Sequence, residues 1–134
     1  MPLRVGVDLV AVDAVRDAVE VHAGRYLARV YTERELADCS TEAGVAPERL
    51  AARFAAKEAA LKVLRRGDDA VAWRCIEVVR DASGWVHLAL SGRAAALADE
   101  AGVEELALSL THEGEYAVAV VVAEVVGERG LRGA

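Results

Sequence analysis

Hydrophobic and polar residues alternate from the start of the chain, over residues 4–11, so that Val5, Val7 and Leu9 share one face. A repeat of two residues is typical of a half-buried β-strand, and we expect a strand here. The spacing of apolar residues then changes to that of a helix from Val12 to Val30. Gly24 is expected to interrupt this helix, because a glycine in the interior of a helix lowers its stability.

The middle of the chain predicts two further helices. The stretch Thr32–Glu35 has the pattern of a capping box, which predicts a short helix after it. Residues 40–47 are expected to form a loop. A long helix is predicted over Pro47–Leu64, because proline is tolerated in the first helical turn. The segment Gly67–Asp69 is expected to end it.

The second half of the chain predicts two pairs of strands separated by an alanine-rich helix. These are strands at about 74–80 and 85–90, a helix at 92–101 with Gly102 as its C-cap, and strands at about 105–111 and 116–125. The order predicts an α+β fold with a mainly antiparallel sheet packed against a long helix. We expect a single domain over residues 1–126 and a flexible C-terminal tail over 127–134.

Composition narrows the cellular setting. The chain has 134 residues, of which 54% are hydrophobic and 4% aromatic, so small aliphatic side chains must form the core. No apolar run approaches the roughly 20 residues of a membrane helix, and we expect no signal peptide, because the strand pattern starts at once. Cys39 and Cys75 lack metal-ligand spacing. We expect free thiols in a reducing cytoplasm, and a disulfide between them is the less favoured alternative.

The net charge of −6 argues against general nucleic-acid binding, which needs a dominant basic surface. A local basic group is nevertheless present, formed by Arg16, Arg25, Arg29 and Arg34. Solvated surface and partner docking are equally favoured interpretations of these arginines.

Candidate chemistry concentrates in the segment Arg53–Lys62, which contains the only two lysines of a chain with fourteen arginines. Glu58 and Lys62 are four apart and neighbour each other on a helix. The same geometry places Glu58 beside Phe54 and Leu61, at the edge of the apolar stripe. A carboxylate there, flanked by cations, suggests a site for phosphate and Mg²⁺. The simpler alternative is a stabilising ion pair of about 0.2–0.5 kcal/mol.

Polar residues in two strands are further candidates. Asp8 interrupts an apolar strand, and a buried carboxylate needs a partner; Gly6 opens space on the same face. An exposed edge-strand position is the simpler interpretation of Asp8. Ser109 and Thr111 share a strand face. His112 lies at the following turn, where it either contacts a ligand or is simply exposed to solvent. Serine-hydrolase, glycine-rich phosphate-loop and zinc motifs are absent from the sequence.

Three segments in order resemble one family, the holo-acyl-carrier-protein synthases, which are small 4′-phosphopantetheinyl transferases. The central RFAAKEAALK is a version of that family's Phe-x-x-Lys-Glu-(Ala/Ser)-x-x-Lys motif and is quite specific. The likeness covers about residues 4–125. The segments are residues 5–10, Arg53–Lys62 and Ser109–His112 with Tyr116 and Ala117, and Thr32–Leu36 also fits.

The resemblance implies the phosphopantetheinyl transferase fold and a Mg²⁺-dependent transferase. Its substrate is coenzyme A, whose 4′-phosphopantetheine arm is transferred to a serine hydroxyl of an apo acyl or peptidyl carrier protein, releasing adenosine 3′,5′-bisphosphate. Asp8 and Glu58 match the metal ligands, and Glu58 and Lys62 match the catalytic residues. The general base is either Glu58 or a metal-bound water. The family forms homotrimers with active sites between subunits. Positions matching the coenzyme-binding residues are Arg53, Lys57, Lys62, Ser109, Thr111 and His112.

The chain departs from the family pattern in two places. Ala11 and Ala14 replace an acidic residue and an arginine, of which the arginine is linked to binding the acidic carrier; Arg16, Arg25 or Arg29 are candidate substitutes. The segment 65–69 replaces a Gly-Thr-Gly-like stretch. These departures favour a polyketide or nonribosomal peptide pathway over fatty acid synthesis. Two alternatives to the transferase remain, a metal-dependent nucleotide phosphohydrolase and a non-catalytic oligomeric binding protein of the same fold.

Overall fold

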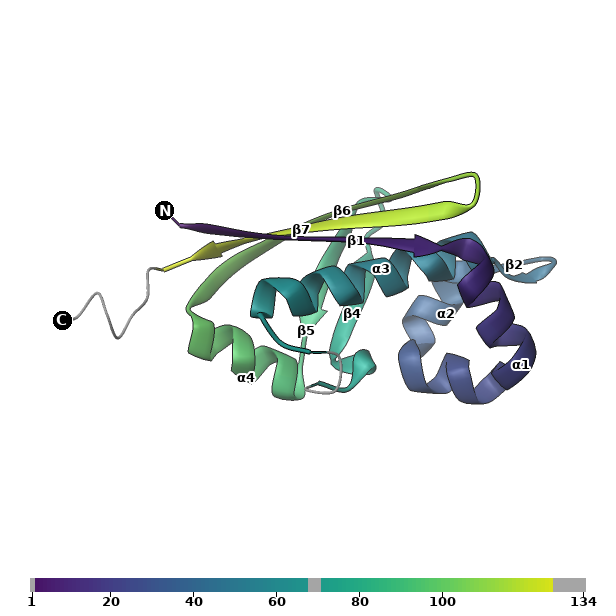
Figure 1. Cartoon of the computed structure of the whole chain (residues 1–134), viewed down its shortest axis with the longest axis horizontal. Coiled ribbons are helices and arrows are strands. Elements are labelled where there is room, and N and C mark those ends of the chain that lie inside the picture. Colours follow the sequence, from purple (N-terminus) through teal and green to yellow (C-terminus); the bar gives the residue numbers. More distant parts are fainter. Residues whose placement is uncertain (1, 68–70, 127–134) are drawn as a thin grey trace.

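A long helix lies across one face of a three-stranded sheet in the computed structural model, which describes residues 2–67 and 71–126 (Figure 1). The helix is α3, Pro47–Leu64. The strands are β1 (Leu3–Ala11), β6 (Val103–Glu113) and β7 (Tyr116–Val125). Their order is β1-β7-β6, and both pairings are antiparallel. The predicted α+β class, with an antiparallel sheet against a long helix, is confirmed.

The other elements lie around α3 and form two small hairpins and three helices. Ser40–Thr41 pairs with Gly44–Val45, and Ile76–Arg80 pairs with Val86–Leu90. In chain order these elements are α1 (Val12–Val30), α2 (Glu33–Cys39), β2 (Ser40–Thr41), β3 (Gly44–Val45), the 3₁₀ turn η1 (Trp73–Cys75), β4 (Ile76–Arg80), β5 (Val86–Leu90) and α4 (Gly92–Ala101).

The face of β1 that carries Gly6, Asp8 and Val10 is turned toward α3. A Cβ atom added at Gly6 would lie 2.1 Å from the carbonyl oxygen of Ala59, so no larger residue fits where the helix crosses the strand. Val10 is buried and the Asp8 side chain is 18% exposed. Alternation along the strand therefore places Asp8 in the layer between the sheet and the helix.

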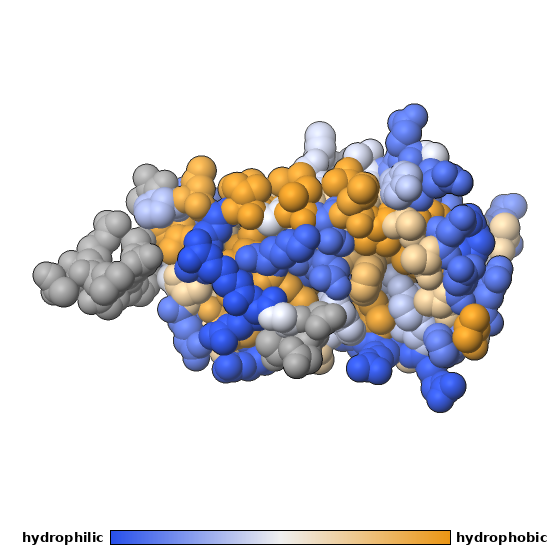
Figure 2. Space-filling model, in the orientation of Figure 1, coloured by the Kyte–Doolittle hydropathy of each residue, from blue (hydrophilic) through white to orange (hydrophobic). Residues whose placement is uncertain are grey.

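The opposite face of β1 is open and apolar. Val5 and Leu9 are each 64% exposed, Leu3 is 62% exposed and Val7 is 52% exposed. Across the sheet these residues continue into half-buried valines of β7, since Val7 is paired with Val120. Figure 2 shows the row of hydrophobic side chains along the edge of the molecule where β1 runs. We call Leu3, Val5, Val7 and Leu9 the outer β1 row.

Several predicted local features are confirmed. The hydroxyl of Thr32 accepts from the backbone N–H of Glu35, and the Glu35 carboxylate accepts from the N–H of Thr32, which completes the capping box. The helices at Pro47–Leu64 and Gly92–Ala101 coincide with the prediction, including Gly102 as a C-cap in the left-handed region. Local sequence signals thus set these helix boundaries.

Other boundaries differ from the prediction. The α1 helix is interrupted at Ala23, with φ 43°, one residue before the expected Gly24. The expected loop at 40–47 contains the β2–β3 hairpin, because the Thr41 hydroxyl accepts from the Ala43 N–H and donates to the Gly44 carbonyl. The long helix ends at Leu64 as predicted, but the residue that ends it is Arg65, in the left-handed C-cap conformation, and not the expected Gly67.

The remaining boundary differences are short. Residues 73–75 form a 3₁₀ turn before β4, and β6 extends from Val103 to Glu113 beyond the expected 105–111. Asp68, Asp69 and the expected tail at 127–134 lie outside the described residues. Within 2–67 and 71–126, no helix is both long and apolar enough to cross a bilayer.

Candidate functional site

Lys62 joins the long helix to the first strand at Asp8. The ammonium Nζ of Lys62 lies 3.1 Å from the Asp8 carboxylate Oδ1 and 2.8 Å from the carbonyl oxygen of Val7. The Lys62 side chain is 53% exposed and that of Asp8 is 18% exposed. The pair therefore lies at the edge of the layer between sheet and helix, where a ligand can approach from solvent.

Glu58 lies one helical turn before Lys62 and is half-buried. Residues four apart share a helix face, so Glu58 belongs to the side of α3 from which Lys62 contacts Asp8. Carboxylates such as those of Asp8 and Glu58 are of the type that Mg²⁺ prefers, since this ion takes one or two protein carboxylates and keeps water and phosphate oxygens as its other ligands. In the described part of the chain, no cluster of three or more His, Cys, Asp or Glu side chains could hold a metal.

A second group of cations lines a hollow of about 200 Å³. Its polar lining comes from separate elements: Arg53 from α3, Arg80 from the end of β4 and His112 from the end of β6. Arg49 also belongs to the lining, and Asp38 contributes one carboxylate. We call this hollow the arginine pocket. Its net positive charge suits an anionic ligand.

Arg53 is the most buried cation of the arginine pocket. The residue is 5% exposed, and its Nη1 donates to the carbonyl of Arg49 at 3.4 Å. Its Nε is buried without a hydrogen-bond partner, as is one carboxylate oxygen of Asp38. Buried polar atoms are normally paired, so an unpaired guanidinium nitrogen fits a site that an anion completes. Arg53 precedes Glu58 by five residues, which is about 7.5 Å along the helix axis.

Ser109 and Thr111 do not lie with His112 in this chain. Ser109 is paired with Val120 and Thr111 with Val118 across β6 and β7, and both side chains are exposed. Since neighbours along a strand point to opposite faces, the two hydroxyls lie on the outer face of the sheet. The structure therefore divides the three expected coenzyme-binding residues of β6 between two faces.

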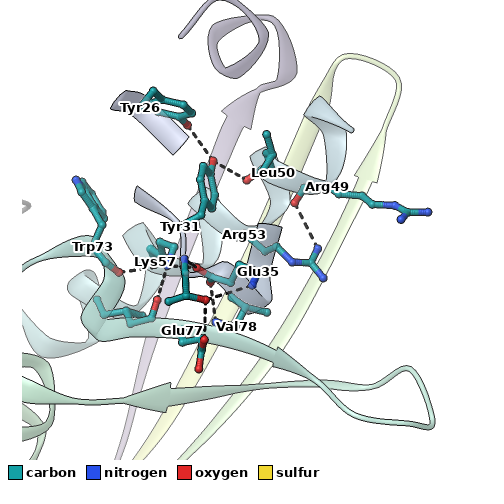
Figure 3. A network of polar contacts seen from close by, with 12 residues as sticks. Tyr26, Tyr31, Glu35, Arg49, Leu50, Arg53, Lys57, Trp73, Glu77 and Val78 are labelled. Atoms are coloured by element: carbon teal, nitrogen blue, oxygen red, sulfur yellow. Dashed lines mark hydrogen bonds and ion pairs between the residues drawn. The ribbon is translucent and has the colours of Figure 1, made fainter. Parts of the chain in front are cut away.

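Lys57, which was expected near the nucleotide, is not among the residues that line the arginine pocket. Its side chain is fully buried, and its Nζ donates to Glu35 Oε1 at 2.8 Å and to the carbonyls of Trp73 and Ile76 at 3.2 and 2.5 Å (Figure 3). Burial lowers the pKa of this ammonium, and the Glu35 carboxylate opposes the change. All three donors of Lys57 are therefore used inside the protein.

The kinked end of α1 forms a third basic surface. His22, Arg25, Tyr26 and Arg29 line a hollow of about 330 Å³. The Tyr26 hydroxyl lies 2.9 Å from that of Tyr31, whose hydroxyl donates to the carbonyl of Leu50 on α3. The hollow is therefore fixed to the core on one side and lined by arginines on the other.

Sequence reasoning missed three residues of these sites. Glu35 was recognised only as a capping residue, because pairing with Lys57 across 22 positions leaves no local signal. Arg49 precedes Arg53 by four residues, a spacing that places both on one helix face and that was available in the sequence. Arg80 is brought to the pocket only by the packing of the β4–β5 hairpin.

Comparisons with known proteins identify the family of this chain. Residues 4–121 match the model of the 4′-phosphopantetheinyl transferase superfamily. A holo-[acyl-carrier-protein] synthase of Chloroflexus aggregans is 48% identical over 131 residues, covering 90% of this chain and 94% of the relative. That of Desulforudis audaxviator is 43% identical, covering 92% and 93%.

Solved structures extend the likeness to three dimensions. The complex of the synthase with coenzyme A from Chronobacterium ammoniagenes has a TM-score of 0.82 at 35% identity, covering 93% of this chain and 98% of that one. The holo-[acyl-carrier-protein] synthase of Neisseria meningitidis has a TM-score of 0.78 at 30% identity, covering 90% and 96%. The chain therefore belongs to the 4′-phosphopantetheinyl transferase superfamily.

Proposed function

We propose that this protein is a holo-acyl-carrier-protein synthase, which transfers the 4′-phosphopantetheine arm of coenzyme A to a serine hydroxyl of an apo carrier protein. The observation that carries the proposal is the contact of Lys62 with Asp8. Glu58 lies one turn before Lys62 on the long helix, and the same helix contributes to the arginine pocket. Coenzyme A carries a pyrophosphate and a separate 3′-phosphate. Two groups of cations spaced along α3 suit such a substrate.

At the pyrophosphate end, Asp8 and Glu58 are the proposed ligands of Mg²⁺. A bound Mg²⁺ would neutralise charge on the phosphoanhydride during transfer. Lys62 donates a hydrogen bond to the Asp8 carboxylate. Its ammonium would stabilise negative charge on the departing bisphosphate. Glu58 is also a candidate base for the attacking serine hydroxyl. The nucleophile comes from the carrier, so no activated serine or cysteine is needed in this chain.

At the nucleotide end, Arg53 and His112 are the proposed contacts of the 3′-phosphate. A planar guanidinium with an unpaired buried Nε recognises phosphate oxygens well. Arg49 and Arg80 add positive charge from two other parts of the lining. This half of the site provides affinity for coenzyme A rather than chemistry.

We further propose a homotrimer with active sites between subunits. The outer β1 row exposes four large apolar side chains on one sheet face, and such faces mark protein interfaces. Ser109 and Thr111 lie on the same outer face, away from the arginine pocket of their own chain. An interface formed by this face would bring both hydroxyls toward a neighbouring subunit, where they can complete its coenzyme site.

The carrier protein is proposed to dock on α1. Arg25 and Arg29 line the hollow there, and they suit an acidic partner because complementary charge steers association. Arg16 already forms an ion pair with Asp13. Of the three candidate substitutes for the missing family arginine, Arg25 and Arg29 are therefore better placed.

The test is mass spectrometry of an apo carrier protein incubated with coenzyme A, Mg²⁺ and this protein. We expect the carrier to gain the mass of one phosphopantetheine. Asp8→Asn and Glu58→Gln should lower the rate on the order of 100-fold or more while the circular dichroism spectrum is unchanged, since a metal ion contributes several kcal/mol.

The same experiment separates the alternatives. A nucleotide phosphohydrolase would release phosphate without any carrier, and a binding protein would leave both the carrier and coenzyme A unchanged. Near-normal loading by either carboxylate variant would show that the metal ligands are wrongly assigned.

A further inference from the structure

Lys57 and Glu35 form a buried ion pair that connects three elements of the fold. Lys57 is on α3, Glu35 is on α2, and both side chains are 0% exposed. The second oxygen of Glu35 accepts the backbone N–H of Val78 on β4 at 2.8 Å. The pair thereby fixes the long helix to the short helix and to the β4–β5 hairpin (Figure 3).

Every polar group of the pair is satisfied. The Lys57 ammonium has three acceptors, two of them the carbonyls of Trp73 and Ile76. Glu35 Oε1 also accepts the N–H of Thr32, at 2.9 Å. Such a pair is costly to desolvate and gives little net stability compared with apolar residues of similar volume. Removing only one partner, in contrast, leaves an uncompensated buried charge.

Besides this pair, α3 is held near its two ends, where Tyr31 donates to the carbonyl of Leu50 and Arg4 donates to that of Val63. Much of its buried surface consists of alanines, whose methyl groups form shallow ridges. The buried Lys57–Glu35 pair adds directional contacts in the middle of this alanine-rich helix. The buried alanines are Ala51, Ala52, Ala55, Ala56, Ala59 and Ala60.

We propose that Lys57 is a positioning residue of the transfer reaction, which acts together with Glu35 to set the rotation of α3 and so the placement of Glu58 and Lys62 opposite Asp8. The inference rests on the proposed function. Lys57 is adjacent to Glu58 in the sequence, so a small rotation at Lys57 moves the carboxylate directly. The interaction with Glu35 also makes α2 and β4 part of the support of the active site.

The test uses Lys57→Met, Glu35→Gln and the double variant in the full chain. We expect both single variants to lower kcat, and to raise the Mg²⁺ concentration for half-maximal activity, by about tenfold or more, as loss of supporting contacts does at metal sites. The double variant should be at least as active as the less active of the two single variants, because the effects of residues that act as one unit do not add. Calorimetric affinity for adenosine 3′,5′-bisphosphate without metal should change less than threefold.

Two outcomes overturn the proposal. In the first, Lys57→Met weakens bisphosphate binding and Glu35→Gln does not, which would make Lys57 a phosphate ligand. In the second, the variants lower only the melting temperature. Leu97→Ala is the control for that case, since it removes a buried side chain of α4 and should lower the melting temperature without changing the Mg²⁺ dependence.

Two further conditions keep the test decisive. Should Lys57→Met alone fail to fold, the double variant is compared with Glu35→Gln. Equal kcat and equal Mg²⁺ dependence of these two variants support the proposal. A lower kcat of the double variant overturns it. Failure of the wild-type protein to load any carrier would reject the proposed function itself. The two failures are therefore distinguishable.

Discussion

Lys62 and Asp8 are 54 positions apart in the sequence, and the Lys62 ammonium lies 3.1 Å from the Asp8 carboxylate. The contact spans the last turns of α3 and the middle of β1. It depends on Gly6, which allows the helix backbone to approach the strand closely. The proposed chemistry at Asp8 and Glu58 therefore depends on how α3 packs against β1.

Lys62→Met should lower kcat/KM for coenzyme A on the order of 100-fold, because charge-assisted hydrogen bonds to a developing negative charge are lost. Steady-state carrier loading measures the effect. Arg93→Met is the control, since Arg93 is an exposed cation on α4 whose removal should leave the rate within twofold. Equal rates for the wild type and Lys62→Met would remove Lys62 from the proposed mechanism.

Gly6→Ala should destabilise the protein by about 1–3 kcal/mol or more, because the new Cβ overlaps the Ala59 carbonyl and forces helix and strand apart. Urea unfolding gives the change in the free energy of unfolding. Gly24→Ala is the matched control, since no atom lies within 4 Å of its added Cβ, and its stability should be unchanged or higher. A neutral Gly6→Ala would contradict the close packing described for β1.

Val7→Glu should dissociate the proposed trimer, because it places a charge in the centre of the outer β1 row. Sedimentation velocity should show trimers for the wild type and monomers for the variant at micromolar concentration. Val21→Glu on α1, at a position that is 72% exposed, should remain trimeric. The interface would be wrongly located if both variants sedimented like the wild type.

Arg53→Met should raise the KM for coenzyme A by about tenfold or more, since a charged hydrogen bond contributes roughly 1.5–3 kcal/mol. The KM for dephospho-coenzyme A, which lacks the 3′-phosphate, should change little. A similar rise for both substrates would mean that Arg53 acts on the fold or on the pyrophosphate instead.

Cys39 should make stability fall at alkaline pH. The thiol is fully buried, and desolvation raises its pKa from 9.0 to about 11, although Arg53 opposes the change. Between these pH values the unfolded thiol ionises and the folded one does not, so folding loses about 2–3 kcal/mol as pH rises from 9 to 11. Urea unfolding across this range should show a steeper fall for the wild type than for Cys39→Ala. Parallel curves would mean that Cys39 ionises equally well in both states.

Local features of the fold could be predicted because their causes are local. The capping box at Thr32 and Glu35, the proline at the start of α3 and Gly102 at the end of α4 each satisfy or free backbone groups within a few residues. The two-residue alternation of β1 separated Val7 from Asp8 in the same way. The family motif likewise singled out Asp8, Glu58 and Lys62 as one candidate site.

The tertiary structure alone decided what each charged residue of the long helix does. Lys57 and Lys62 look equivalent in the sequence, yet one is enclosed by Glu35 and two carbonyls while the other reaches Asp8 at the surface. The difference arises because α3 is covered on its Lys57 side by α2 and β4, elements whose packing no local pattern encodes. Burial then turns one ammonium into a support and leaves the other available to a ligand.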